Sequence, residues 1–332
     1  MNTAESTRLT NLDPDTAAFL RALDAQGGPP LYTLSPQDAR QVLVNIQQSV
    51  RVSAPAADIE DRIISGPTGQ IPLRIVRPQG MIGTLPAVLY IHGGGWVLGD
   101  ALTHDRLIRE LAVGAQAAIV FVDYTRSPEA YYPMALEQAY TAARWVAEQG
   151  RSANLDGSRL VVAGDSVGGN MVAALTMLAK TRGGPGIEFQ ALFYPVTDIT
   201  NFDTPSYRQF GDGGYWLTRK AMQWFVESYA PDLNVRSDLT VSPLHAAREH
   251  LQGLPPALIL TGECDILRDE GEAYAHKLMG AGVRVEAARV LGTIHDFMLL
   301  NPLAQTPPVR AAITLASATL RQALGRQAAA AI

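Results

Sequence analysis

The sequence predicts an α/β protein with a mostly parallel central sheet flanked by helices. Its 332 residues are 47% hydrophobic and 18% charged, which is a globular composition. Parallel α/β enzymes of this length form one main core with appendages. From about residue 58 onward, short β-branched segments alternate with helix-like stretches, and this alternation is typical of βαβ units.

The elements are expected in a definite order along the chain. The first 50 residues have helical spacing, with one helix start at Asp13-Pro14 and another after Ser35-Pro36. Strands are expected at Ile59–Ile64, Ile71–Val76, Ala87–Ile91, Ile119–Val122, Leu160–Ala163, Phe189–Phe193, Ala257–Leu260 and Val283–Val290. Helices are expected at His104–Val113, Met134–Glu148, Met171–Lys180 and in a stretch that ends near Met279.

One stretch interrupts this alternation. Residues 202–229 include eight aromatic residues, whereas the whole chain is 7% aromatic. From Leu217-Thr218 to Tyr229 the spacing is helical, and the strand pattern returns only near Ala257. We therefore expect residues 197–250 to leave the sheet, either as an inserted cap or as a buried helical pair.

The composition excludes several classes of function. The net charge is −5, and the basic residues are scattered, so no nucleic-acid surface is expected. No run approaches the roughly 18 apolar residues that span a membrane. The single cysteine, Cys264, cannot form an internal disulfide or a thiolate metal cluster. Because the first residues are polar and acidic, unlike a secretory signal, a cytoplasmic protein is expected.

The segment Gly164-Asp165-Ser166-Val167-Gly168 has the form G-x-S-x-G and lies between a predicted strand and a predicted helix. This is the context of a nucleophile elbow, in which a strained turn exposes the serine and glycines on either side let the backbones cross closely. The alternative is a tight turn with no chemical role, and the motif alone does not exclude it. Other motifs in the chain are needed to distinguish a nucleophile elbow from such a turn.

A second motif, His92-Gly93-Gly94-Gly95-Trp96, follows the predicted strand Ala87–Ile91. Consecutive glycines there expose backbone N–H groups that can hold the negatively charged oxygen of a tetrahedral intermediate. A glycine loop can instead bind phosphate, but neither G-x-x-x-x-G-K-[ST] nor G-x-G-x-x-G occurs in the chain. No cofactor is expected. No metal is expected either, because H-E-x-x-H is absent and the histidines are dispersed.

A serine nucleophile needs a histidine base and a carboxylate that orients it. Of the six histidines, His295 lies on a loop after a late strand, whereas the others fit structural or solvated positions. Asp265 follows the strand Ala257–Leu260 and gives the chain order Ser, Asp, His. Glu263 and Asp269 are the rivals for the acid. Asp269 and Glu270 are explained as first-turn acids of the following helix.

These motifs, with Asp265-Ile266-Leu267-Arg268-Asp269-Glu270-Gly271, resemble the bacterial hormone-sensitive-lipase-like esterases (family IV) of the α/β-hydrolase fold. The resemblance implies an oxyanion hole formed by Gly94, Gly95 and Val167. Three positions depart from the family pattern: Val167 replaces alanine, Ile266 replaces proline, and Asp296 replaces the glycine after the histidine. A carboxylate at Asp296 that faces the imidazole would raise its pKa, whereas one that faces solvent would have little effect.

The resemblance also implies a helical cap of residues 1–50 and 197–250 over a catalytic core of residues 51–196 and 251–332. The candidate pocket residues are Trp96, Tyr215, Trp216 and Phe297. The implied activity is that of a carboxylesterase acting on small esters with short to medium acyl chains. An amidase, a lactonase, an acyltransferase or a non-catalytic receptor would use the same fold, and a homo-oligomer is left open.

Overall fold

A sheet of eight strands forms the centre of this computed structural model, which describes residues 11–325. The strand order is β1-β2-β4-β3-β5-β6-β7-β8. β1 and β2 pair with each other, and β2 pairs with β4, in antiparallel fashion, while every other neighbouring pair is parallel. The strands are β1 (Ala57–Gly66), β2 (Gly69–Pro78), β3 (Leu85–Ile91), β4 (Ala118–Val122), β5 (Leu155–Asp165), β6 (Phe189–Phe193), β7 (Ala257–Cys264) and β8 (Val285–Ile294). The predicted fold class is confirmed.

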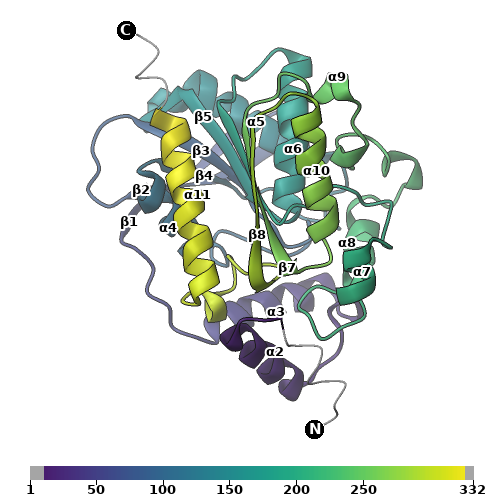
Figure 1. Ribbon diagram of the computed structural model, residues 1–332. Coiled ribbons are helices and arrows are strands. Elements are labelled where there is room, and N and C mark those ends of the chain that lie inside the picture. The colour runs from purple at the N-terminus through teal and green to yellow at the C-terminus, as the bar shows by residue number, and fades with distance from the viewer. Residues whose placement is uncertain (1–10, 326–332) are drawn as a thin grey trace.

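Helices cover both faces of the sheet (Figure 1). α4 (Asp105–Ala115) packs against α11 (Pro307–Gly325) on one face, and α5 (Met134–Gln149), α6 (Val167–Arg182) and α10 (Arg268–Gly280) cover the other. The central strands are therefore buried on both sides, and β4 and β6 are buried at every residue. Their β-branched and aliphatic side chains form the core of the molecule.

Two helices begin where their capping residues predict. In α2 (Pro14–Gln26) the Asp13 carboxylate accepts hydrogen bonds from the first-turn amides of Asp15 and Thr16. In α3 (Pro36–Gln48) the Ser35 hydroxyl accepts a hydrogen bond from the amide of Asp38. Proline is the first residue of both helices, where its missing N–H leaves no donor without a partner.

Five strands end beyond their predicted apolar segments, namely β1, β2, β5, β7 and β8, and the last three lead to candidate site residues. β5 continues to Asp165 and β7 to Cys264. β8 continues to Ile294 because Cys264 pairs with Ile294 after a register shift beyond Gly262. The loop expected before His295 is therefore strand. As a result, Ser166, Asp265 and His295 are each the first residue after a parallel strand, at one edge of the sheet.

Residues 197–250 contain no strand of the sheet. They form α7 (Pro205–Phe210), α8 (Arg219–Tyr229), α9 (Arg248–Leu251) and the short 3-10 turns η3 (Leu233–Val235) and η4 (Pro243–His245). In Figure 1, α2 and α3 lie at the same end of the sheet as α7 and α8. Two pairs of helices far apart in sequence, α2 with α3 and α7 with α8, thus lie beyond the carboxyl ends of the strands, whereas α9 lies at the opposite end of the sheet. Residues 1–10, which belong to the expected cap, are outside the described residues.

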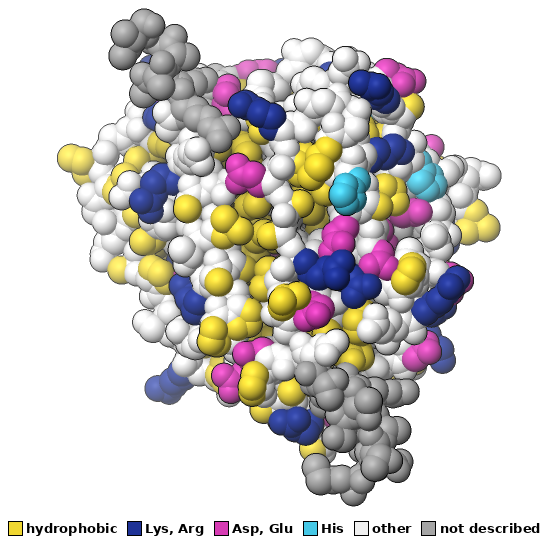
Figure 2. All heavy atoms as spheres, viewed as in Figure 1, with side chains coloured by type: hydrophobic (Ala, Val, Ile, Leu, Met, Phe, Trp, Pro, Cys, Tyr) yellow, Lys and Arg dark blue, Asp and Glu magenta, His cyan; other side chains and the backbone are white. Residues whose placement is uncertain are grey.

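The face in Figure 2 intersperses basic side chains with acidic ones. Apolar side chains follow β8 between α10 and α11, where Leu291 and Leu315 are exposed. Within residues 11–325, no helix is long and apolar enough to cross a membrane.

Candidate active site

Ser166 lies on the sharp turn that connects β5 with α6. Its backbone is in a strained region for a residue with a side chain, with φ of 54° and ψ of −118°. The flanking glycines make this turn possible: a Cβ on Gly164 would lie 2.6 Å from backbone atoms of Gly168 and Ile91, and one on Gly168 would lie 1.9 Å from the Ile91 oxygen. The strand end, the turn and the helix start are therefore packed backbone against backbone.

The three candidate catalytic side chains meet at this edge of the sheet. Nε2 of His295 lies 2.9 Å from the Ser166 hydroxyl oxygen, and Nδ1 of His295 lies 2.7 Å from a carboxylate oxygen of Asp265. The same Asp265 side chain accepts a hydrogen bond from the amide of Leu267, which fixes its orientation. All three side chains are buried, with at most 4% of each residue exposed. The arrangement can transfer the serine proton to a histidine that a carboxylate holds in place.

The rival acids lie elsewhere. Glu263 accepts a hydrogen bond from the amide of Gly292, and Asp269 accepts one from the amide of Ser206. Glu270 does more than stabilise a helix start, because it is 2% exposed and accepts hydrogen bonds from the amides of Thr197 and Asp198. It attaches the beginning of the 197–250 segment to α10. Burial raises the pKa of Glu270 well above its usual range.

The glycine loop after β3 lies beside Ser166. Gly94 and Gly95 both line the same cavity as the serine, and both have positive φ values, 99° and 63°. A Cβ on Gly95 would lie 2.2 Å from the ring of Phe225. Val167, whose N–H is the third expected donor, is buried as the first residue of α6. The first N–H groups of a helix have no partner within the helix, so this amide can face an anion.

Asp296 faces the imidazole of His295. One carboxylate oxygen lies 3.4 Å from His295 Nε2, and the other accepts a 2.8 Å hydrogen bond from the Trp216 indole. Burial by itself lowers the pKa of His295, but the negative charges of Asp265 and Asp296 outweigh it and raise that pKa from 6.5 to about 9. Of the two orientations that the sequence allows for Asp296, the structure has the one that affects the base.

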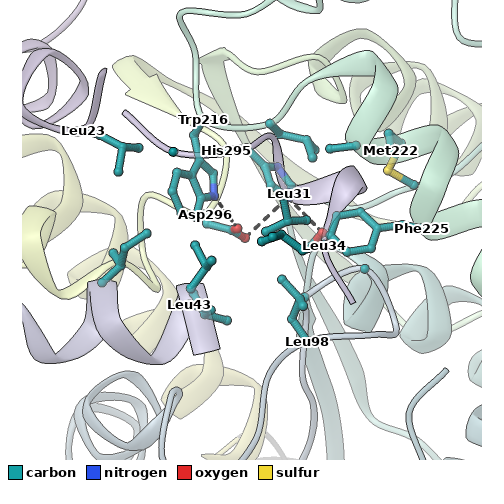
Figure 3. Close-up of a pocket in the computed structure, with 18 of the residues that line it drawn as sticks. Leu23, Leu31, Leu34, Leu43, Leu98, Trp216, Met222, Phe225, His295 and Asp296 are labelled. Carbon is teal, nitrogen blue, oxygen red and sulfur yellow. Dashed lines mark hydrogen bonds and ion pairs between the residues drawn. The ribbon is translucent and has the colours of Figure 1, made fainter. Parts of the chain in front are cut away.

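A cavity of about 320 Å³ opens onto Ser166, His295 and Asp296 (Figure 3). One part of the wall comes from the N-terminal helices and the turn between them, and another part comes from residues 216–225. Its hydrophobic lining consists of Leu23, Leu31, Leu34, Val42, Leu43, Ile46, Leu98, Trp216, Leu217, Ala221, Met222 and Phe225. The sequence gives only a weak signal for most of these, namely the apolar spacing of the first two helices.

Of the four aromatic residues expected at the pocket, only Trp216 lines it. Trp96 is fully buried and stacks on Tyr229 at a ring separation of 4.1 Å. Phe297 is also fully buried and packs on Tyr194, while Tyr215 packs edge-on against Phe210. These three expectations are corrected: the side chains turn away from the cavity because neighbouring aromatic rings provide apolar partners elsewhere.

The remaining motif residues, His92, Gly93 and Asp165, do not line the cavity, and the side chains of His92 and Asp165 are fully buried. The His92 ring stacks on Tyr124 at 4.1 Å, and its Nδ1 lies 2.8 Å from the Gly93 oxygen. Among residues 11–325, no three His, Cys, Asp or Glu side chains are grouped so that they could hold a metal ion.

Comparison with known proteins places this chain among esterases. Residues 88–299 match the sequence model of a family described as the alpha/beta hydrolase fold. Carboxylesterase NlhH of Mycobacterium tuberculosis is 42% identical over 257 residues, which cover 75% of this chain and 79% of that protein. An ethyl acetate hydrolase of Pseudomonas putida is 35% identical over 305 residues, covering 88% of this chain and 94% of the relative.

The similarity extends to solved structures. The crystal structure of a thermostable esterase from Pseudomonas putida superposes with a TM-score of 0.93 at 51% sequence identity. The match covers 95% of this chain and 98% of that one, so it includes the helices outside the sheet.

Proposed function

Because the chain belongs to this α/β-hydrolase family and is a carboxylic ester hydrolase, we propose that it cleaves small esters with a triad of Ser166, His295 and Asp265. The resemblance to hormone-sensitive-lipase-like esterases is thereby confirmed at the level of the family. The observation that carries the proposal is the chain of short contacts from Asp265 through His295 to Ser166.

The chemistry follows from these contacts. Ser166 Oγ forms a bond to the ester carbonyl carbon while His295 Nε2 takes the serine proton, and Asp265 stabilises the imidazolium. The N–H groups of Gly94, Gly95 and Val167 stabilise the oxyanion. The tetrahedral intermediate collapses, the alkoxide leaves with the proton from His295, and an acyl-enzyme remains. Water then attacks by the same route, which releases the acid and returns the proton to Ser166.

The apolar cavity supports short to medium acyl chains as substrates. Its volume of about 320 Å³ suits a small molecule, and aliphatic side chains provide most of its lining. Both segments that we propose as the cap, residues 1–50 and 197–250, contribute to this lining within the part of the chain that the structure describes. Their packing would set the longest chain that fits.

The test is a series of p-nitrophenyl esters with acyl chains from two to sixteen carbons, measured for the wild type and for Ser166→Ala. The wild type is expected to hydrolyse the short and medium esters, and the variant is expected to fall to the background rate. Matching amides and an added alcohol acceptor would show whether amide cleavage or acyl transfer competes. A folded wild type that turns over none of these esters would contradict the proposal.

A further inference from the structure

We call the loop of Gly93, Gly94 and Gly95 after β3 the oxyanion loop. Beneath it lies a histidine–carboxylate pair that the proposed mechanism does not use. His104 Nε2 lies 3.4 Å from one carboxylate oxygen of Asp165, and both residues are fully buried. His104 precedes α4, whereas Asp165 is the last residue of β5 and directly precedes Ser166. An ionised group has a high cost in such a position unless an opposite charge and hydrogen bonds compensate for it.

Asp165 joins the two backbone segments that form the oxyanion hole. Its Oδ1 accepts hydrogen bonds from the Gly93 amide at 3.1 Å and from the Tyr90 hydroxyl at 2.7 Å. A Cβ on Gly93 would lie 2.3 Å from Oδ2, so the loop approaches the carboxylate as closely as only glycine allows. The Asp165 carboxylate therefore belongs to the residue before Ser166 and also binds Gly93, the residue before Gly94.

The surroundings of His104 favour a proton on both ring nitrogens. Nε2 faces the Asp165 carboxylate, and Nδ1 lies 3.2 Å from the carbonyl oxygen of Asp100, which can only accept. The Thr103 hydroxyl, 3.1 Å from Nδ1, can adapt to either role. Burial lowers the pKa of His104, but the charge of Asp165 outweighs this and raises it; the same contact overcomes burial and lowers the pKa of Asp165.

The neighbouring His92 shows the opposite state. Its ring lies 5.4 Å from that of His104, yet Nε2 has no hydrogen-bond partner and Nδ1 faces the Gly93 carbonyl. Burial, reinforced by the charge of His104, lowers the pKa of His92 to about 3, so this ring is neutral. Only one of the two adjacent rings faces a carboxylate, and only that ring has a reason to be charged.

We propose that the buried His104–Asp165 ion pair positions the oxyanion loop against the nucleophile turn, with both side chains acting as positioning residues. The proposal rests on the proposed esterase function, since it concerns the same oxyanion hole. Asp165 in its ionised form accepts hydrogen bonds from both Gly93 and Tyr90. His104 supplies the charge that keeps Asp165 ionised without water. The loop is then already in place when negative charge develops on the substrate, which lowers the barrier without strengthening substrate binding.

The test compares His104→Gln, His104→Ala and Asp165→Asn on one short p-nitrophenyl ester. Losing a whole oxyanion donor costs about 10²–10³ in kcat, and a displaced loop is expected to cost about tenfold to a hundredfold. KM is expected to stay within about twofold. Affinity for an alkyl trifluoromethyl ketone, which forms a tetrahedral adduct on the serine, is expected to fall by the same factor as kcat. His104→Gln keeps an amide donor and is expected to retain more activity than His104→Ala.

The matched control is His245→Gln. His245 Nε2 lies 3.3 Å from Asp198, so this variant removes a second histidine–carboxylate pair, neither member of which lines the cavity. It is expected to keep wild-type kcat and ketone affinity. If His104→Gln matched the wild type in both, or if its loss were entirely in KM, the proposal would be overturned.

A spectroscopic measurement on the wild type removes the dependence on variants that fail to fold. Two-dimensional ¹⁵N–¹H correlation of the histidine rings at neutral pH is expected to show His104 with two protonated nitrogens and His92 with one. A neutral His104 ring would overturn the proposal even if the esterase function held. A wild type with a charged His104 but no ester hydrolysis would instead contradict the proposed function.

Discussion

The edge of the sheet and the wall of the cavity are built from different interactions. At the edge, Ser166, Asp265 and His295 each follow a buried parallel strand, and polar contacts of 2.7 to 2.9 Å join them. The wall is made of aliphatic and aromatic side chains from two segments far apart in sequence. Positions at the edge are fixed by backbone pairing and directional hydrogen bonds, whereas the wall depends on packing, which is not directional.

This difference has a functional meaning. A change at the edge is expected to act on the chemical step, and a change in the wall is expected to alter which acyl chain is preferred. Asp296 and Gly95 connect the two regions, since Asp296 contacts both His295 and Trp216, and Gly95 packs under Phe225. Substitutions can test how separate the regions are.

The largest effect is expected for Asp265→Asn. The amide cannot hold His295 in the required tautomer, so turnover is expected to fall by about 10⁴. The turnover is measured from steady-state hydrolysis of a short p-nitrophenyl ester. Glu263→Gln is the matched control, because Glu263 lies two residues away and accepts its hydrogen bond from Gly292. An unchanged rate in Asp265→Asn, with a large loss in Glu263→Gln, would transfer the role to Glu263.

The next effect is expected for Gly95→Ala, at the boundary between edge and wall. The new Cβ would meet the Phe225 ring at 2.2 Å and displace the loop, so kcat is expected to fall by about 10²–10³. The double variant Gly95→Ala/Phe225→Ala makes room for the methyl group and is expected to recover part of the loss. No recovery in kcat would mean that the loop depends on its own backbone conformation and not on the wall.

A smaller effect is expected for Asp296→Asn, which shifts the pH dependence. His295 must be neutral to act as the base, and its pKa is raised to about 9, so kcat/KM is expected to rise with pH toward that value. Removing one of the two negative charges lowers the pKa and should move the midpoint down by about one pH unit. Asparagine can still accept the Trp216 hydrogen bond. Identical midpoints for wild type and variant would show that Asp296 has no effect on the base.

The smallest effect is expected in the wall itself. Leu31→Ala enlarges the cavity and is expected to raise kcat/KM for longer acyl chains relative to butyrate by severalfold, since a methylene in an apolar pocket contributes about 1–3 kcal/mol. The measurement is the chain-length profile. Tyr215→Leu, outside the lining, is the control. An equal change of profile in both variants would mean that the preference reflects general loosening of these segments.

The sequence predicts the edge well because its signals are local. The glycines around Ser166 and in the loop after β3 are required by close backbone approaches, and such requirements are visible in a few adjacent letters. The parallel order of strands then implies that residues after β5, β7 and β8 meet at one edge. Even where β8 extends further than its apolar run, His295 still follows the strand end.

The sequence predicts the cavity wall poorly because many residues that do not line the cavity are also large and apolar. Trp96 and Phe297 have the size and hydrophobicity of pocket residues, but each has an aromatic neighbour that buries it completely. Leucines of α2 and α3 resemble any helix core in the sequence, yet some of them face the cavity. Which apolar side chain faces a cavity and which fills the core depends on how distant segments pack.

The sequence alone therefore determines the fold class, the edge of the sheet at which the candidate site lies, and the candidates for nucleophile, base and acid. Each of these follows from local backbone requirements. Tertiary structure alone decides the direction of Asp296, the shape of the cavity and the pairing of His104 with Asp165. These features depend on contacts between residues 61 or more positions apart, such as His104 and Asp165 or Trp216 and Asp296. No local pattern specifies such contacts, because their free energy depends on burial and on partners that only the folded chain brings together.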